Sequence, residues 1–139
     1  MKKLAFVIGA AAIILGLASP SGVLAGTERM TTEELTALIS GTTVYGTSSQ
    51  GKKFIQVFGE DGSLESGNTG RKDSDGKWKP YEYGSWKVKD GKLCNSYTKP
   101  KKRSGGCDKF YKTDDGKYVY TTRSGGRGSF DKIVVGRPE

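Results

Sequence analysis

No histidine occurs among the 139 residues of this chain, and cysteine occurs only twice. Without histidine, the Ser–His and Cys–His pairs of nucleophilic enzymes cannot form, and the commonest metal-binding side chain is missing. The acidic residues stand mainly in Asp-Gly turns and at a helix start, which are ordinary structural positions. We therefore expect a protein that is not an enzyme and that needs no metal and no cofactor.

The sequence also lacks an apolar run long enough to cross a membrane. Residues 4–17 are apolar and follow Lys2 and Lys3, but this run is shorter than the roughly 20 residues that a transmembrane helix needs. The segment ends in the small residues of a signal-peptidase site, Val23 and Ala25. We predict a signal peptide over residues 1–25 and a single domain over residues 26–139, with a periplasmic or secreted location.

Basic residues outnumber acidic ones. The predicted signal peptide holds two of the 23 basic and none of the 15 acidic side chains, so the rest carries 21 minus 15, a net charge of +6. This excess favours anionic partners such as lipid head groups, phosphorylated sugars, nucleic acid or an acidic protein. Because an exported protein rarely meets RNA, we expect no nucleic-acid partner. We expect a monomer with no transmembrane segment once the signal is removed.

The two cysteines, Cys94 and Cys107, lie close together in the sequence. In an oxidising compartment a disulfide that closes this short loop is favoured, with about 3 kcal/mol of stabilisation in the loop-entropy model. Two free thiols or a shared metal are the alternatives that the residues leave open.

One helix start is clear. Thr31 is placed as an N-cap, Glu34 completes a capping box, and Met30 and Leu35 are placed as a hydrophobic staple around it. Leu35, Leu38 and Ile39 then share one apolar face, and Gly41 is a stop signal. We predict a short helix that plugs or flanks a sheet.

From residue 42 onward the apolar period becomes that of strands. Asp-Gly pairs recur at residues 61–62, 75–76, 90–91 and 115–116, and such pairs favour tight hairpin turns. The segment 84–94 has the pattern of a central hairpin, with Trp86 and Val88 alternating with polar residues before Asp90-Gly91. We predict a mainly β fold, a small antiparallel meander barrel or sandwich. The expected strands cover residues 42–45, 54–58, 63–65, 81–89, 92–97, 109–113, 117–122 and 130–135.

The polar segment 60–80 is predicted to be a long excursion from the sheet. Within it, Asp73-Ser74-Asp75-Gly76 resembles the opening of a calcium loop, but the glycine is fourth where an EF-hand needs it sixth. A turn is therefore the favoured interpretation of this stretch.

Several motifs together carry a family resemblance. They are the helix end with Ser40-Gly41-Thr42-Thr43-Val44, the segment from Gly84-Ser85-Trp86 to Leu93-Cys94, the second cysteine Cys107, and the closing Val134-Val135-Gly136 with Pro138. This pattern resembles a family of small exported bacterial single-disulfide domains of unknown function. The resemblance implies a lipocalin-like or barrel-like β fold in the envelope or secreted fraction, and it carries over no catalytic residue.

Two basic segments contain the same tetrapeptide, Arg-Ser-Gly-Gly, at residues 103–106 and 123–126. In a barrel both could lie at the same end, where arginine side chains and loop amides would converge on an anionic group. The alternative is that both are solvated turns in which lysine and arginine maintain solubility. The predicted anion-binding residues are Lys99, Lys101, Lys102, Arg103, Arg123 and Arg127.

The second half of the chain is rich in aromatic residues. Trp86 is predicted to lie in the core, and Glu82, between Tyr81 and Tyr83, is predicted to face solvent on its strand. A closed barrel could also carry an apolar ligand in a cavity lined by Phe54, Phe58, Trp86 and Val88.

These observations favour an exported binding module that contacts an anionic envelope component or a partner protein through its two basic, glycine-rich loops. An inhibitor of an envelope or secreted enzyme is the second hypothesis, although a basic target such as a lysozyme would be repelled by the positive charge. A carrier of a small apolar ligand inside the barrel is the third.

Overall fold

The computed structural model describes residues 27–138, and the predicted signal peptide lies outside this range. Over the described residues the chain forms one α-helix and nine β-strands. They are β1 (Thr27–Arg29), α1 (Thr32–Ile39), β2 (Thr42–Thr47), β3 (Lys53–Phe58), β4 (Ser63–Asn68), β5 (Glu82–Lys89), β6 (Lys92–Lys99), β7 (Cys107–Thr113), β8 (Tyr118–Thr121) and β9 (Arg127–Val135).

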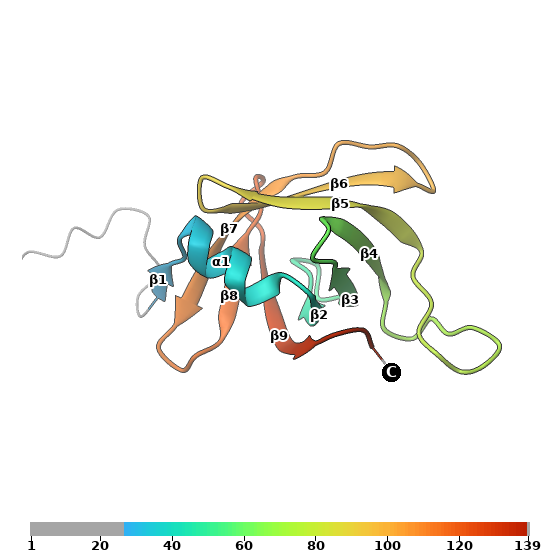
Figure 1. Cartoon of the computed structure of the whole chain (residues 1–139). Coiled ribbons are helices and arrows are strands. Elements are labelled where there is room, and N and C mark those ends of the chain that lie inside the picture. Colours follow the sequence, from blue (N-terminus) through green and yellow to red (C-terminus); the bar gives the residue numbers. More distant parts are fainter. Residues whose placement is uncertain (1–26, 139) are drawn as a thin grey trace, which may run out of the picture.

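Strands β2 to β9 form a closed antiparallel barrel (Figure 1). Each strand pairs with the next along the chain, and β9 pairs back onto β2, for example through Thr43 opposite Val134. The predicted meander barrel is confirmed over the sandwich alternative. Closure occurs because it leaves these eight strands without the two exposed edges that an open sheet would have.

Strand β1 was not predicted, because its three polar residues show no alternation of apolar and polar side chains. It pairs with the second half of β7, where Arg29 lies opposite Tyr111, while β6 pairs only with the first half, from Cys107 to Lys109. The short strand thus covers the part of β7 that β6 leaves unpaired.

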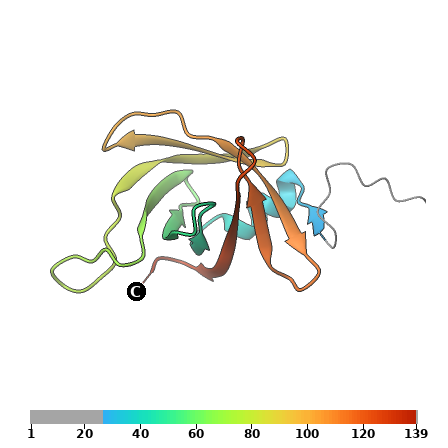
Figure 2. The ribbon, with the colours of Figure 1, turned by 180° about the vertical axis from the view of Figure 1, so that it is seen from behind.

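The helix α1 begins with the predicted capping box. The Thr31 amide donates to Glu34 Oε2 at 2.9 Å, and the Glu34 amide donates to Thr31 Oγ1 at 3.2 Å. Leu35 and Ile39 are fully buried, and Met30 joins the same core cluster. Viewed from behind, α1 lies on the far side of β8 and β9 (Figure 2). The predicted short helix is confirmed, with its apolar face buried in the core, and we call the end of the barrel where α1 lies the closed end.

Aromatic rings fill the half of the barrel beneath the helix. Phe110 and Phe130 lie 4.8 Å apart between ring centroids, and Phe130 also contacts Phe58 and Tyr120. Trp86 packs edge-on against Phe58 at 5.7 Å, and its indole N–H donates to the Gly59 carbonyl at 2.9 Å. The prediction that Trp86 belongs to the core is confirmed.

The connections β2–β3, β4–β5, β6–β7 and β8–β9 lie at the other end of the barrel, because antiparallel strands alternate in direction. We call this the open end. The longest connection, residues 69–81, extends away from the barrel body (Figure 1). Its Asp73 carboxylate accepts from the amides of Asp75 and Lys77, as a turn does. No helix within residues 27–138 has the length and apolar character required to cross a membrane.

Candidate functional site

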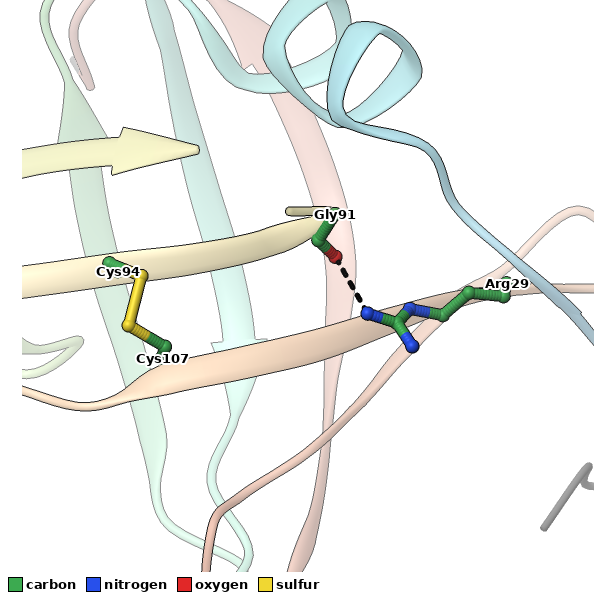
Figure 3. The surroundings of a disulfide bond; sticks show 4 residues. All are labelled: Arg29, Gly91, Cys94 and Cys107. Carbon is green, nitrogen blue, oxygen red and sulfur yellow. Dashed lines mark hydrogen bonds between the residues drawn. A yellow bond between two sulfur atoms is a disulfide. The ribbon is translucent and has the colours of Figure 1, made fainter. Parts of the chain in front are cut away.

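The disulfide joins the first half of β6 to the first residue of β7. Cys94 and Cys107 are register partners on these adjacent strands and form the predicted bond (Figure 3). Since β6 and β7 share only three register pairs, the crosslink holds a seam of the barrel that has few backbone hydrogen bonds. It also fixes both ends of the loop that carries residues 99–103.

The turn between β5 and β6, at the closed end, is held by the N-terminal segment. The Arg29 guanidinium donates to the Gly91 carbonyl at 3.3 Å (Figure 3), and the Gly91 amide donates to Thr32 Oγ1 at 2.7 Å. The half of the β5–β6 hairpin next to its turn is thus held twice, by these bonds and by the disulfide at Cys94.

The two Arg-Ser-Gly-Gly loops lie at the same end of the barrel and line one groove. This groove has a volume of about 540 Å³. Three of its lining side chains are cationic, two are threonines, and no acidic side chain is among the described residues that line it. We call it the cationic groove, and its lining residues are Lys92, Gly105, Gly106, Cys107, Lys109, Thr121, Thr122 and Arg123.

Strand register explains why these cations meet. Lys92 lies opposite Lys109, Lys109 opposite Thr121, and Thr121 opposite Arg127. These positions form one row across four neighbouring strands, on the outer face. Cross-strand like charges destabilise a sheet, so a row of cations with no carboxylate among the lining residues is an arrangement that a bound anion would relieve.

The two equivalent tetrapeptides use glycine for different reasons. Gly125 adopts a φ of +88°, the left-handed region that favours glycine. Gly105 instead lies directly against the backbone of β6, where a Cβ would overlap the Asn95 carbonyl oxygen. The loop 99–106 can therefore approach the strand only with glycine at this position.

Replacing Gly105 by alanine is expected to lower the free energy of unfolding by about 1 kcal/mol, because the exposed loop must shift away from Asn95. Gly106→Ala is the matched control, since its Cβ would meet no atom closer than 4.0 Å. Urea unfolding of the two variants measures the difference, and equal stability would show that the close approach is not required.

Arg103 does not lie in the cationic groove. Its guanidinium forms an ion pair with Glu82 and stacks over the Tyr97 ring at 4.3 Å. The prediction that Glu82 faces solvent is therefore wrong: its carboxylate lies at the open end of the barrel interior, beside Tyr97. Arg103 is thus engaged with Glu82 and Tyr97 and is not a free anion ligand.

The other predicted anion-binding residues are distributed around the open end. Arg123 lines the cationic groove, and Arg127 begins β9 in the same row. Lys101 and Lys102 are exposed on the disulfide loop. Lys99 lies elsewhere, in an outer groove of about 630 Å³ together with the Glu65–Arg137 ion pair.

Lys92 and Lys109 were not predicted as site residues. They stand on strands with ordinary alternation, where a lysine is the usual solvent-facing residue. Only the pairing of β6 with β7 and of β7 with β8 places them beside Arg123.

A second cavity, of about 280 Å³, lies inside the barrel toward the open end. Its lining is mixed, with aromatic rings on one side and polar groups on the other. We call it the inner cavity, and its lining residues are Ser48, Phe54, Gln56, Ser66, Glu82, Leu93, Asn95, Tyr97, Gly106, Asp108, Phe110, Tyr120 and Phe130.

Burial shifts three titratable groups in the inner cavity. It raises the pKa of Tyr97, and it raises the pKa of Tyr120 to about 12, with the Asp108 charge contributing. Both hydroxyls therefore stay protonated and can donate or accept hydrogen bonds. Burial also raises the pKa of Asp108 to about 6, so this carboxylate is ionised at neutral pH but at a cost in free energy.

The polar lining of the inner cavity bears on the hypothesis that the barrel carries a small apolar ligand. Phe54 does line the inner cavity, but Phe58, Trp86 and Val88 pack into the core beneath it. The inner cavity is lined instead by polar residues that include Gln56, Ser66 and Asn95. A purely apolar ligand would leave these polar groups without hydrogen-bond partners.

No group of histidine, cysteine, aspartate and glutamate side chains within residues 27–138 is arranged to hold a metal ion. No protein-family model, curated protein or solved structure gives a significant match to the chain. The family resemblance of its motifs therefore stays a prediction.

Proposed function

We propose that this protein is a non-enzymatic binding module that contacts an anionic component of the cell envelope, or an anionic partner protein, through the cationic groove. The observation that carries the proposal is the convergence of Lys92, Lys109 and Arg123 around the Gly105-Gly106 loop, with no carboxylate among the lining residues.

The chemistry of the groove suits a phosphate or carboxylate group. Lysine ammonium groups and an arginine guanidinium form charge-assisted hydrogen bonds with such anions. The disulfide clamps the Cys107 wall of the groove, so the loop loses less conformational entropy on binding than a free tail would. Lys101, Lys102 and Arg127 add positive charge around the rim and would speed encounter with an acidic surface.

A periplasmic or secreted location goes with this proposal. The disulfide requires an oxidising compartment to persist, and the predicted signal peptide would deliver the chain there. Both would place the groove where anionic envelope lipids and polysaccharides occur.

Changing Lys92, Lys109 and Arg123 together to serine is expected to weaken anion binding about tenfold, because each exposed charge contact contributes about 0.2–1 kcal/mol. Retention of the purified protein on phosphocellulose and on sedimented envelope material, at low and high salt, measures the effect. The bound envelope fraction then identifies the class of partner.

The matched control removes the same charge elsewhere, with Lys72, Lys77 and Lys132 changed to serine. The first two residues lie in the loop 69–81 and the third lies on β9. If both triple variants lose retention equally, net charge and not the groove is responsible. A further variant, with Lys101 and Lys102 changed to serine, tests the exposed part of the disulfide loop by itself.

A further inference from the structure

The inner cavity holds a carboxylate without a partner. Asp108 lies on β7 with its side chain toward the barrel interior, and it makes no hydrogen bond or ion pair with the described residues. The other acid of the cavity, Glu82, is already neutralised by Arg103. Asp108 is thus the single uncompensated charge among the described residues that line the cavity.

A second group in the inner cavity is also unsatisfied. Asn95 Oδ1 is buried and accepts no hydrogen bond within the described part of the chain, while the same side chain interacts with the Tyr97 hydroxyl. Asn95 lies on β6, next to β7. Its backbone N–H donates to the carbonyl of Gly106 at 3.1 Å, and Gly106 lies two residues before Asp108. Buried acceptors without donors are rare in native proteins because each costs about 1–3 kcal/mol. Both groups are hydrogen-bond acceptors, so they require a donor.

The remaining wall of the cavity is aromatic. Phe54, Phe110 and Phe130 line it together with Tyr120, and Phe110 lies 5.3 Å from Tyr120 between ring centroids. The faces of such rings attract cations and also pack against apolar carbon. At about 280 Å³ the space is close to the lower end of the range, about 300–1,000 Å³, typical of small-molecule sites.

We propose that the inner cavity binds a small organic cation, a compact primary amine whose ammonium group donates to Asp108 and Asn95 while its apolar part packs against the phenylalanines. No cationic side chain is among the described residues that line the cavity, and the nearby Arg103 is paired with Glu82. A free carboxylate, a free amide oxygen and aromatic faces together recognise an ammonium group better than a neutral or anionic ligand.

This site is separate from the cationic groove, although the two share one wall. Gly106 lines both spaces, and the adjacent residues Asp108 and Lys109 point to opposite faces of β7.

The test is a titration of the isotopically labelled full chain with ethylamine, butylamine and benzylamine, followed by NMR. Benzyl alcohol serves as the neutral counterpart of benzylamine. At about pH 8, where the amines are protonated and Asp108 is ionised, we expect saturable shifts of inner-cavity residues with an amine. We expect benzyl alcohol to bind at least about tenfold more weakly than benzylamine.

Asp108→Asn keeps the shape of the side chain and removes its charge. We expect this variant to raise the Kd of the amine about tenfold, while Asp114→Asn, in the exposed β7–β8 turn, leaves the Kd unchanged. Lowering the pH to about 4.5 should weaken binding to the parent protein and have little effect on the Asp108→Asn variant. The other titratable and charged groups facing the cavity are Glu82 with Arg103, Tyr97 and Tyr120, and the tyrosines do not ionise in this range.

Three results would overturn the proposal. They are the absence of saturable cavity shifts with all three amines, equal binding of benzylamine and benzyl alcohol, and an unchanged Kd in Asp108→Asn. The first would leave a cavity filled by water alone. The groove proposal is tested independently, because the groove triple variant should bind the amine normally and the Asp108→Asn variant should be retained on phosphocellulose.

Discussion

Replacing both Cys94 and Cys107 by serine is expected to lower the free energy of unfolding by about 3 kcal/mol, since the crosslink closes a loop with a sequence separation of 13. A loss of this size is a large part of the roughly 5–15 kcal/mol that stabilises a typical domain. Urea unfolding of the double variant, beside the parent protein with and without a reducing agent, measures it.

The location of the bond explains why its loss should also affect function. β6 and β7 share three register pairs, and Cys94 opposite Cys107 is the last of them before the loop 99–106. Without the bond the strands can separate at the wall that the cationic groove and the inner cavity share. We therefore expect weaker retention on phosphocellulose under conditions where the variant is still folded. A variant within about 1 kcal/mol of the parent would show that backbone pairing alone holds this seam.

Replacing Asp108 by asparagine is expected to stabilise the protein by about 2 kcal/mol at pH 8. Burial raises the pKa of this carboxyl from 3.8 to about 6, so between these values the folded state binds the proton more tightly than the unfolded state. The contribution of Asp108 to stability therefore falls as the pH rises from about 4 to about 6 and stays low above that range.

The expected gain in stability follows from the rise in the pKa of Asp108. For a fully enclosed carboxyl this rise would correspond to about 3 kcal/mol. Solvent that reaches Asp108 through the open end screens part of this energy and leaves about 2 kcal/mol. Thermal or urea unfolding from about pH 4 to about pH 8 measures the gain, which should vanish at the acidic end. The control Asp114→Asn should show no gain at either end.

A stabilising effect of Asp108→Asn has a functional meaning. Residues at binding or catalytic positions often lower the stability of the protein, and a neutral residue of the same shape at that position then raises it. If the variant is instead less stable than the parent at pH 8, the carboxylate has a stabilising partner and its role is structural. The measurement thus supports or weakens the cavity proposal without needing a ligand.

Much of the fold could be predicted from the sequence because its signals are local. Thr31 and Glu34 cap a helix through bonds that span three residues, and the alternation of Trp86 and Val88 marks a strand by itself. Eight of the nine observed strands, β2 to β9, overlap the segments predicted from alternation and Asp-Gly boundaries, whereas β1 depends on the unpaired half of β7 and had no local signal.

The candidate site could be predicted only in part. The sequence placed Arg123 in a basic loop, and the structure puts it in the cationic groove. Arg103, in the twin loop, pairs with Glu82 because the disulfide loop folds back onto β6 through a bridge between Tyr97 and Arg103, and β6 pairs with β5. The two residues are 21 positions apart in the sequence, and no local pattern predicts their contact.

The sequence by itself determined the helix, strands β2 to β9, the turns and the disulfide, because capping, alternation and turn chemistry act over a few residues. Only the tertiary structure decided which charges share a surface. The register of β6, β7 and β8 brings Lys92 and Lys109 to Arg123, and closure of the barrel encloses Asp108. Both depend on contacts between residues far apart in the chain, and strand alternation alone leaves their partners undefined.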